Sequence, residues 1–405
     1  MAEKKDLTYQ GCYGSKMKPS EIKNWILDCV EDNSNREKNK ITCNIWGPPG
    51  CGKTSIIKSL EDVGYKIVDI PLAQIEEMGD ILGFPVEEIE MANEKGTVWI
   101  KAVDSLISSY LKEGYVNTGG QRTVYAPPAW VPRVEEKGVI LFDDGNRASQ
   151  RIMKGLMQLV QDYRTISWKI PKGWTIIFTG NPDNRFNQVT SMDTAQLTRM
   201  KHITLTPDAV EWASWATDNG IDSRLINFIL RYPEMMIGKE RTNPRTLAEF
   251  GRTLKKYPVL DKSNHQRVSV EAYASLDDET VQTMMVFFER NAELVIEPIV
   301  ILEDPDKAKT EIERLMTKQE PRIDIVNVIN DRLFAFITSS VYEHKKEHIK
   351  PFQDWLTNKY LPKDAAYSFV RRLVFSDCPY RRQLLSGNTE LLEIVKITWG
   401  KGQPW

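Results

Sequence analysis

Residues 47–54 read Gly-Pro-Pro-Gly-Cys-Gly-Lys-Thr, and this motif constrains the fold more than any other part of the 405-residue chain. Its spacing, Gly-x4-Gly-Lys-Thr, is that of a phosphate-binding P-loop. Such a loop follows a buried strand and opens a helix. The apolar run 41–46 precedes it, and residues 55–60 continue with helical spacing. A glycine-rich turn that matched by chance would not need this strand–turn–helix setting, so the motif predicts a parallel α/β sheet.

The residue types of the loop indicate how it would hold a nucleoside triphosphate. Glycines let consecutive backbone N–H groups turn toward one anion, and the helix N-terminus adds its positive end. We expect Lys53 to reach the β- and γ-phosphates and the Thr54 hydroxyl to bind Mg²⁺. The residues predicted to contact the nucleotide are Gly47, Pro48, Pro49, Gly50, Cys51, Gly52, Lys53, Thr54 and Ser55.

Composition places the chain among ordinary globular proteins. Charged residues make up 27% and hydrophobic residues 41%, and the length allows two or three domains. The formal net charge of −2 gives no global attraction to nucleic acid, so a nucleic-acid partner is disfavoured but stays open. The five cysteines form no Cys-x-x-Cys pair, which fits free thiols in a reducing compartment.

Two further observations concern location. No apolar run reaches the roughly 20 residues that span a bilayer. The N-terminus also lacks the apolar segment of a signal peptide. We therefore expect a cytoplasmic protein without a membrane partner.

Five short apolar segments bounded by turn residues predict the strands of a parallel sheet covered on both faces. They are 41–46, 66–71, 138–143, 174–180 and 202–206. Helical patterns alternate with them, notably over 149–163. The interval 72–137 is too long for one helix and predicts an inserted hairpin or helix pair. The expected fold class is α/β, with helices on both faces of the sheet.

From residue 207 onward the pattern is helical throughout. This predicts four parts along the chain. They are an N-terminal helix and linker (1–40), an α/β nucleotide-binding domain (41–206), a small all-α lid (207–258) and a helical C-terminal extension (259–405).

Two carboxylates end the third predicted strand. The apolar run 139–142 is followed by Asp143 and Asp144. We expect Asp143 to hold Mg²⁺, mainly through water, and Asp144 to orient and deprotonate the attacking water. An exposed turn would also place carboxylates here, but the P-loop upstream favours the catalytic interpretation.

Three polar residues complete the candidate site. Asn181 follows the fourth predicted strand, where an amide would lie beside the γ-phosphate. Arg199 directly precedes the fifth strand, and Arg245 begins a helix of the predicted lid. A guanidinium is always charged and forks onto phosphate oxygens, which suits an arginine finger or a lid sensor. A lone arginine is more often a solvated surface residue, but the order of these residues along the chain favours the functional interpretation.

This order of motifs resembles that of AAA+ ATPases, specifically the MoxR-like branch grouped with dynein-related ATPases. The resemblance covers about residues 40–255 and is carried by GPPGCGKT, ILFDDGNRA, FTGNPDN, AQLTRM and NPR, together with the segments 126–132, 158–162 and 170–174. It implies that Asn181 is the sensor 1 residue and that Arg199 serves a neighbouring protomer. It also implies a hexameric ring that binds ATP between protomers, often beside a partner with a von Willebrand factor A domain.

The sequence departs from that branch at three positions. Asp144 stands where glutamate is usual and is one methylene shorter, which would loosen water positioning and slow turnover. Gly145 follows it where relatives carry a larger residue, and Thr198 replaces the usual aspartate before the finger arginine. Rings of this kind often place a pore loop in the long insertion. Phe84, Tyr115 and Val116 are candidates for such a loop, although burial of these apolar side chains is favoured.

The predicted function is Mg²⁺-dependent ATP hydrolysis by a ring that remodels or activates a protein partner. One alternative is a nucleic-acid motor or restriction-type GTPase of the same branch. The other is an ATP-switched scaffold with little turnover, which the shorter acid at Asp144 would permit.

Overall fold

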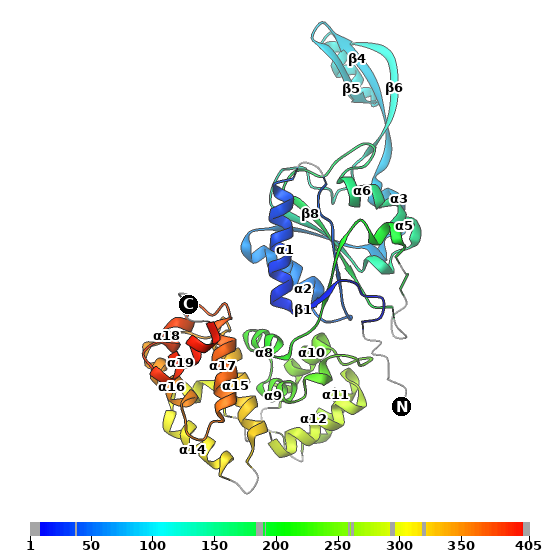
Figure 1. Cartoon of the computed structure of the whole chain (residues 1–405). Coiled ribbons are helices and arrows are strands. Elements are labelled where there is room, and N and C mark those ends of the chain that lie inside the picture. Colours follow the sequence, from blue (N-terminus) through cyan, green and yellow to red (C-terminus); the bar gives the residue numbers. More distant parts are fainter. Residues whose placement is uncertain are drawn as a thin grey trace. The chain divides into compact units, whose positions relative to one another are not determined.

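The computed structural model describes residues 9–36, 39–183, 189–190, 192–257, 260, 263–291, 296–317 and 321–399. The chain divides into two compact units, residues 1–206 and 207–405, which run from blue to green and from green to red in Figure 1. Within the described residues, no helix is both long and apolar enough to cross a bilayer.

The first unit is built on a six-stranded sheet in which every pair of neighbours is parallel (Figure 1). In spatial order its strands are β1 (Ser15–Met17), β9 (Lys201–Leu205), β2 (Cys43–Trp46), β8 (Trp174–Gly180), β7 (Gly138–Asp143) and β3 (Lys66–Pro71). The five predicted strands are confirmed, and β1 adds a sixth. Because the strands share one direction, the carboxyl ends of β2, β7 and β8 meet at one edge of the sheet.

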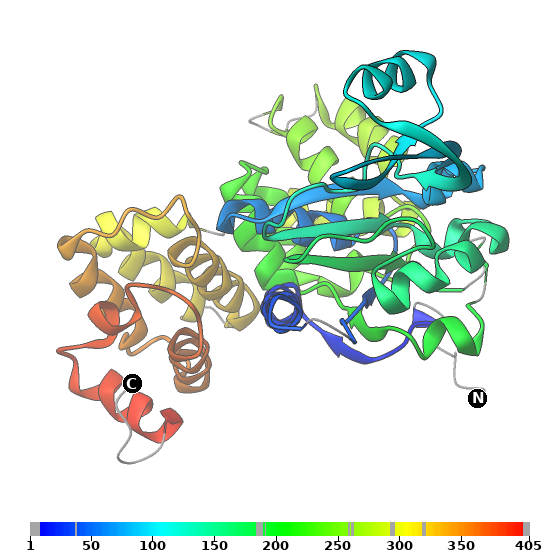
Figure 2. The same ribbon diagram turned by 90° about the horizontal axis from the view of Figure 1, so that it is seen from above.

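Helices cover both faces of this sheet, as Figure 2 shows from above. On one face, α1 (Pro19–Ser34) and α2 (Lys53–Lys58) share a core with the side chains of Ile45 and Leu141. On the other face, α5 (Gln150–Gly155) and α6 (Met157–Asp162) share a second core that includes Ile140, Phe142, Ile176 and Phe178. The expected α/β fold class is therefore confirmed.

The helical pattern predicted over 149–163 forms two helices, α5 and α6, which are separated at Leu156. Gly155 ends α5, and a Cβ atom there would lie 2.0 Å from Cε of Met78. Glycine thus permits a close approach at a point where it also weakens the helix.

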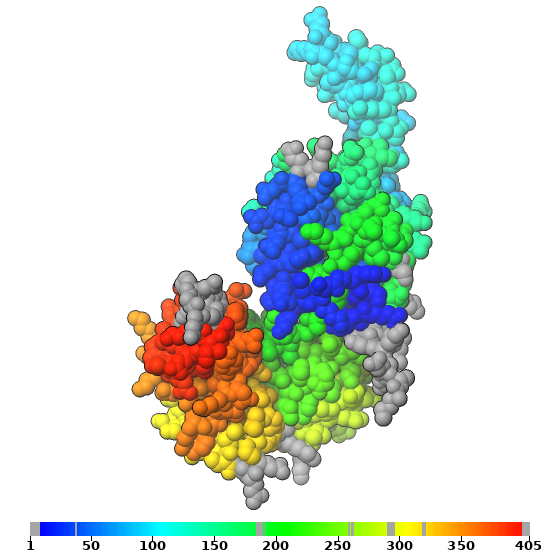
Figure 3. Space-filling view, in the orientation of Figure 1, coloured from blue at the N-terminus to red at the C-terminus, as the bar shows by residue number. Residues whose placement is uncertain are grey.

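The long insertion forms a separate antiparallel sheet rather than a helix pair. Its spatial order is β5 (Gly96–Lys101), β4 (Phe84–Asn93) and β6 (Val116–Ala126), and α4 (Asp104–Lys112) connects β5 to β6. The space-filling view in Figure 3 shows it in cyan. Phe84 and Val116 are each 62% exposed, so the expectation that these side chains are buried is wrong. The half-buried Tyr115 packs edge-on against Tyr110.

Short helical elements connect the strands of the first unit. They are η2 (Ser59–Val63), η3 (Leu72–Gln74), α3 (Met78–Leu82), η4 (Gly145–Arg147) and α7 (Thr194–Leu197). Of these, η4 follows β7 directly and lies at the carboxyl edge of the sheet, while α7 precedes β9 at the opposite edge.

The second unit is helical, as the sequence predicts. Its helices are α8 (Ala209–Asp218), α9 (Ser223–Arg231), η5 (Pro233–Met236), α10 (Pro244–Leu254), α11 (His265–Ser275), α12 (Asp278–Asn291), α13 (Pro298–Glu303), α14 (Pro305–Met316), α15 (Ile323–Ile337), η7 (Lys346–His348), α16 (Ile349–Leu356), α17 (Lys363–Val374), α18 (Arg381–Leu385) and α19 (Thr389–Trp399). One apolar core joins them, including Leu225 of α9 and Leu333 of α15. The boundary between a lid and an extension at 258/259 stays a prediction.

Candidate functional site

The P-loop leaves the carboxyl end of β2, a strand whose four residues are all buried. Gly50 and Gly52 have φ angles of 73° and 100°, in the left-handed region where glycine alone has no steric penalty. Gly47 donates its N–H to the carbonyl of Gly180, at 3.1 Å, which fastens the loop to the end of β8. The loop therefore lies at the edge where β2 and β8 end.

Lys53 is the buried cation of this loop, with 6% of its surface exposed. Its Nζ donates to the carbonyl oxygens of Gly47 at 2.7 Å and Pro48 at 3.0 Å, and to Oδ1 of Asn181 at 3.0 Å. A buried ammonium needs such acceptors to offset its lost hydration. All three acceptors are neutral oxygens, so a phosphate oxygen can replace them with a stronger, charge-assisted bond.

The two residues predicted to bind metal lie together. Thr54 Oγ1 is 3.1 Å from each carboxylate oxygen of Asp143. Thr179 also donates its hydroxyl to Asp143 Oδ1. Hydroxyl and carboxylate oxygens are the hard ligands that Mg²⁺ prefers, and it usually takes one or two carboxylates plus substrate phosphates. The donor set present here fits that ion.

Asp144 has a left-handed backbone, with φ 54° and ψ 42°. Aspartate tolerates this conformation better than glutamate does, because its short polar side chain can bond locally. Its N–H donates to Thr179 Oγ1 at 2.9 Å, and its Oδ2 lies 3.8 Å from Nε of Arg147. The shorter acid therefore suits the turn on which it stands. A Cβ atom at Gly145 would lie 2.9 Å from Phe178, so this glycine permits close packing.

Asn181 joins the P-loop to the second acid. Its Oδ1 accepts from Lys53, and its Nδ2 donates to Oδ1 of Asp144 at 2.7 Å. The side chain is almost completely buried at the end of β8. The structure thus brings Lys53, Thr54, Asp143, Asp144 and Asn181 into one hydrogen-bonded cluster.

Two residues of this cluster, Thr179 and Asn146, were not predicted from the sequence. Thr179 is a buried polar residue inside an apolar strand, and its hydroxyl donates to the carboxylate of Asp143 and accepts the backbone N–H of Asp144. Asn146 pairs with the backbone of Asn181. For Thr179 the available signal was a polar residue one position before the strand end. For Asn146 the sequence offered only its place in the motif ILFDDGNRA, residues 140–148.

Arg199 lies at the opposite edge of the sheet from its own P-loop. It stands two residues before β9, whose first residue, Lys201, pairs with Cys43 at the start of β2. The P-loop follows the other end of β2, roughly 10 Å away at about 3.3 Å per residue. The exposed guanidinium bonds Gln161 Oε1 at 2.8 Å and the Ala195 carbonyl at 2.6 Å. The structure does not bring Arg199 to the site of its own chain.

Arg245 belongs to the second unit, in the first turn of α10. Pro244 at the first helical position and Asn243 as N-cap set this helix start, and Asn243 Oδ1 accepts the N–H of Arg245 at 3.0 Å. The side chain is exposed. Its role toward the nucleotide stays a prediction.

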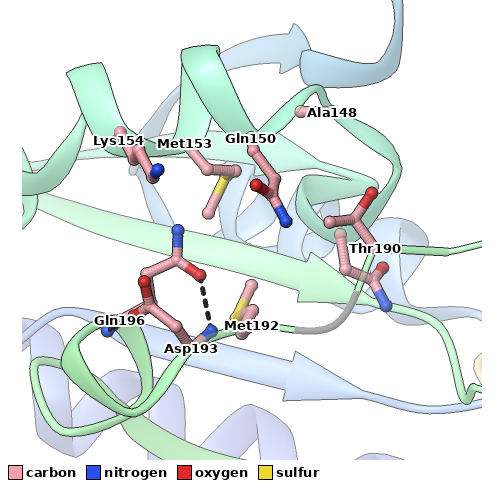
Figure 4. A pocket seen from close by; sticks show the side chains of 9 residues that line it. Ala148, Gln150, Met153, Lys154, Thr190, Met192, Asp193 and Gln196 are labelled. Carbon is pink, nitrogen blue, oxygen red and sulfur yellow. Dashed lines mark hydrogen bonds between the residues drawn. The ribbon is translucent and has the colours of Figure 1, made fainter.

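A small pocket of about 110 Å³ lies beside Asn146 (Figure 4). Side chains of α5, including Gln150 and Met153, face Asp193 and Gln196 across it. Gln196 accepts the N–H of Asp193 at 2.9 Å, the dashed line in Figure 4. Asn146 belongs to both the cluster and the lining of this pocket, but no P-loop residue lines it.

No family model matches the chain, and no curated protein matches it. Among solved structures, the chain is similar to point mutants of RuvB from Thermotoga maritima. One is 14% identical, with 74% of this chain and 79% of that chain covered and a TM-score of 0.35. Another is 12% identical, with 75% and 85% covered and a TM-score of 0.35. With TM-scores this low, the likeness does not indicate what the chain binds or does.

His202 connects the strand before the P-loop to the segment before Arg199. Trp46 Nε1–H donates to His202 Nδ1 at 3.0 Å, and His202 Nε2 lies 2.8 Å from the carbonyl of Leu197. Because Nδ1 accepts, the neutral ring carries its proton on Nε2 and donates it to Leu197. Burial lowers the pKa of His202 below its ordinary value of 6.5.

We expect acidification below about pH 6.5 to destabilise the first unit through His202. The unfolded chain binds this proton more readily than the folded chain, because the folded pKa is lowered. Protonated Nδ1 would also face the N–H of Trp46. Urea unfolding of wild type and His202→Gln at pH 7.5 and 5.5 measures the effect. The wild type should lose more stability on acidification than the variant, and an equal loss in both would contradict the assignment.

Proposed function

We propose that the chain is an ATPase of the AAA+ class that hydrolyses ATP with Mg²⁺ at the carboxyl edge of its parallel sheet. The observation that carries the proposal is the side chain of Asn181, which bonds both Lys53 and Asp144. The amide of Asn181 thereby holds both Lys53, the cation that would bind the phosphates, and Asp144, the acid that would activate the attacking water. Beside them, Asp143 and Thr54 supply oxygen ligands.

The residues of the cluster take distinct roles in this proposal. Lys53 exchanges its neutral acceptors for oxygens of the β- and γ-phosphates. Asp144 accepts a proton from water, whose oxygen forms a bond to the γ-phosphorus while the bond from that phosphorus to the ADP oxygen breaks. Asn181 orients the water and Asp144. Mg²⁺, held by Thr54 and Asp143, neutralises charge on the phosphates when bound.

The position of Arg199 supports a site completed by a second copy of the chain. Its guanidinium is exposed at the sheet edge opposite its own P-loop, so only a neighbour's phosphate is within its reach in a closed assembly. A heterologous contact that places one edge against the other builds a ring when its rotation closes and an open filament when it does not. We propose such a ring, hexameric by resemblance to the AAA+ class, in which Arg245 acts as a lid sensor.

The finer assignment rests on the motif order alone. On that ground we propose a MoxR-like member that remodels a protein partner in the cytoplasm, with a von Willebrand factor A domain as a candidate partner. Its rivals are a nucleic-acid motor or GTPase and a scaffold with little turnover. Phosphate release measured with ATP, with GTP, and with ATP plus DNA separates the three. ATP-specific release that DNA does not stimulate supports the proposal.

Substitution of Lys53 tests the nucleotide site directly. We expect Lys53→Ala to abolish ATP binding, because it removes the only side-chain cation in the P-loop. Titration of a fluorescent ATP analogue measures the affinity. Lys58→Ala is the matched control, since Lys58 lies on the same helix but pairs with Asp69 at 2.6 Å. Unchanged affinity in Lys53→Ala would rule out this site.

A further inference from the structure

Asn146 lies in the turn that follows the two acids and is 4% exposed. Its Nδ2 donates to the backbone carbonyl of Asn181 at 2.7 Å, and its Oδ1 accepts the backbone N–H of Asn181 at 3.0 Å. The side-chain amide therefore pairs with both polar groups of one residue, as a neighbouring strand would. This pairing satisfies both backbone groups at the buried end of β8.

The same contact fixes two elements that carry the chemistry. Asn146 and Asp144 belong to one short turn, and Asn181 directly follows β8, the strand beside β7. With its backbone held by Asn146, Asn181 can direct its amide to Lys53 and Asp144 at the same time. The backbone carbonyl of Asn146 also accepts the N–H of Thr190 at 2.7 Å, a second contact that restrains this turn.

We propose that Asn146 is a positioning residue for hydrolysis, which acts through Asn181 and touches neither nucleotide nor water. This inference rests on the proposed function of the same site. Its physical basis is that a buried amide with two bonds resists displacement, because breaking either bond leaves a buried group unpaired. A misplacement of about 1 Å in a reacting group costs on the order of 10²-fold in rate.

The chain offers a matched control in Asn33. This asparagine is 1% exposed and makes the same pair of bonds with another backbone residue, to the N–H of Ile41 at 2.6 Å and its carbonyl at 2.7 Å. Ile41 precedes β2, at the edge of the sheet opposite the P-loop. Asn33→Ala therefore removes the same pair of backbone bonds at a distance from the site, together with the bonds from Asn33 Nδ2 to the hydroxyls of Tyr163 and Thr175.

The test combines affinity, rate and a double-mutant cycle. We expect Asn146→Ala to bind ATP within about twofold of wild type and to lower kcat by about 10- to 100-fold, by analogy with the range for outer-shell residues that orient metal ligands. In an Asn181→Ala background the same substitution should cost little more, because the side chain that it positions is gone. Asn33→Ala should lower stability while leaving kcat near that of wild type.

Hydrogen exchange gives a readout that does not depend on turnover. The amide of Asn181 should be protected in wild type and lose protection in Asn146→Ala, while Asn33→Ala leaves it unchanged. Should Asn146→Ala fail to fold, Asn146→Asp keeps the acceptor, removes the donor and is judged by the same criteria.

The possible outcomes separate this inference from the proposed function. A wild type that releases phosphate alongside an equally fast Asn146→Ala overturns the inference alone. So does a full additional loss in the Asn181→Ala background, since that indicates a merely structural role. A wild type that binds ATP but releases no phosphate overturns both.

Discussion

Replacing Arg199 with alanine is expected to leave ATP binding intact and to lower hydrolysis by roughly 10³- to 10⁵-fold, the contribution of an arginine finger supplied in trans. The reason is geometric. Arg199 lies beyond the amino end of β9, while the P-loop lies beyond the carboxyl end of β2, so the residue cannot serve its own chain. Fluorescent-nucleotide titration and phosphate release on the same preparation measure the two effects. Arg382→Ala, an exposed arginine of α18, is the control.

Mixing two inactive variants tests whether the finger acts between copies. Arg199→Ala keeps an intact P-loop, and Lys53→Ala keeps an intact finger, so a mixed interface restores one complete site. We expect activity to appear on mixing, although neither variant has it alone. If assemblies shown by mass measurement to contain both variants stay inactive, the trans assignment is wrong. The nucleotide site would stand, and the next candidates would be Arg147, 3.8 Å from Asp144, and Arg185, which lies outside the described residues.

Replacing Asp144 with asparagine is expected to preserve ATP binding and to lower turnover by about 10²- to 10⁴-fold, the usual contribution of a general base. Asparagine has nearly the same shape, tolerates the left-handed backbone and retains the acceptor for Asn181. It loses the capacity to take a proton. The metal ligands Thr54 and Asp143 are untouched, so nucleotide affinity should stay within a few-fold.

Initial rates of phosphate release and a nucleotide titration check this prediction. Asp69→Asn makes the same change on the neighbouring strand β3, where the side chain pairs with Lys58 outside the cluster. Its turnover should match that of wild type. If Asp144→Asn keeps turnover within a few-fold of wild type, the base is another group.

The sequence predicted the central strands well for a physical reason. Strands β7 and β8 have the predicted bounds, because a strand covered on both faces is a continuous apolar run between turn residues. The edge strand β3 also has the predicted bounds, although most of its residues are not buried. β1 was missed because its three residues, Ser15–Met17, are too few and too exposed to carry a pattern. Its place in the sheet depends on pairing with β9, about 190 residues later in the chain. The inserted sheet was left ambiguous because much of it is exposed on both faces.

The site divides in a similar way. The P-loop follows β2, and the two acids stand at the end of β7, with Asp143 as its last residue. Because the carboxyl ends of parallel strands meet at one edge, the proximity of these residues follows from their order along the chain. Thr179 and Asn146 could not be found in this way. Their contacts join residues 35 or 36 positions apart, through side-chain geometry that no spacing rule encodes. Arg199 and Arg245 depend on a second copy and on the second unit, so their roles stay predictions.

Steady-state phosphate release from ATP is the most direct test of the proposed hydrolysis at this site. Wild type and Lys53→Ala would be compared at saturating ATP, in Mg²⁺ and after its removal with a chelator. We predict that the wild type releases phosphate at a rate that saturates with ATP. The chelator should abolish this release, and Lys53→Ala should not show it. The proposed hydrolysis would be contradicted if the wild type, shown to be saturated with ATP, released phosphate no faster than Lys53→Ala.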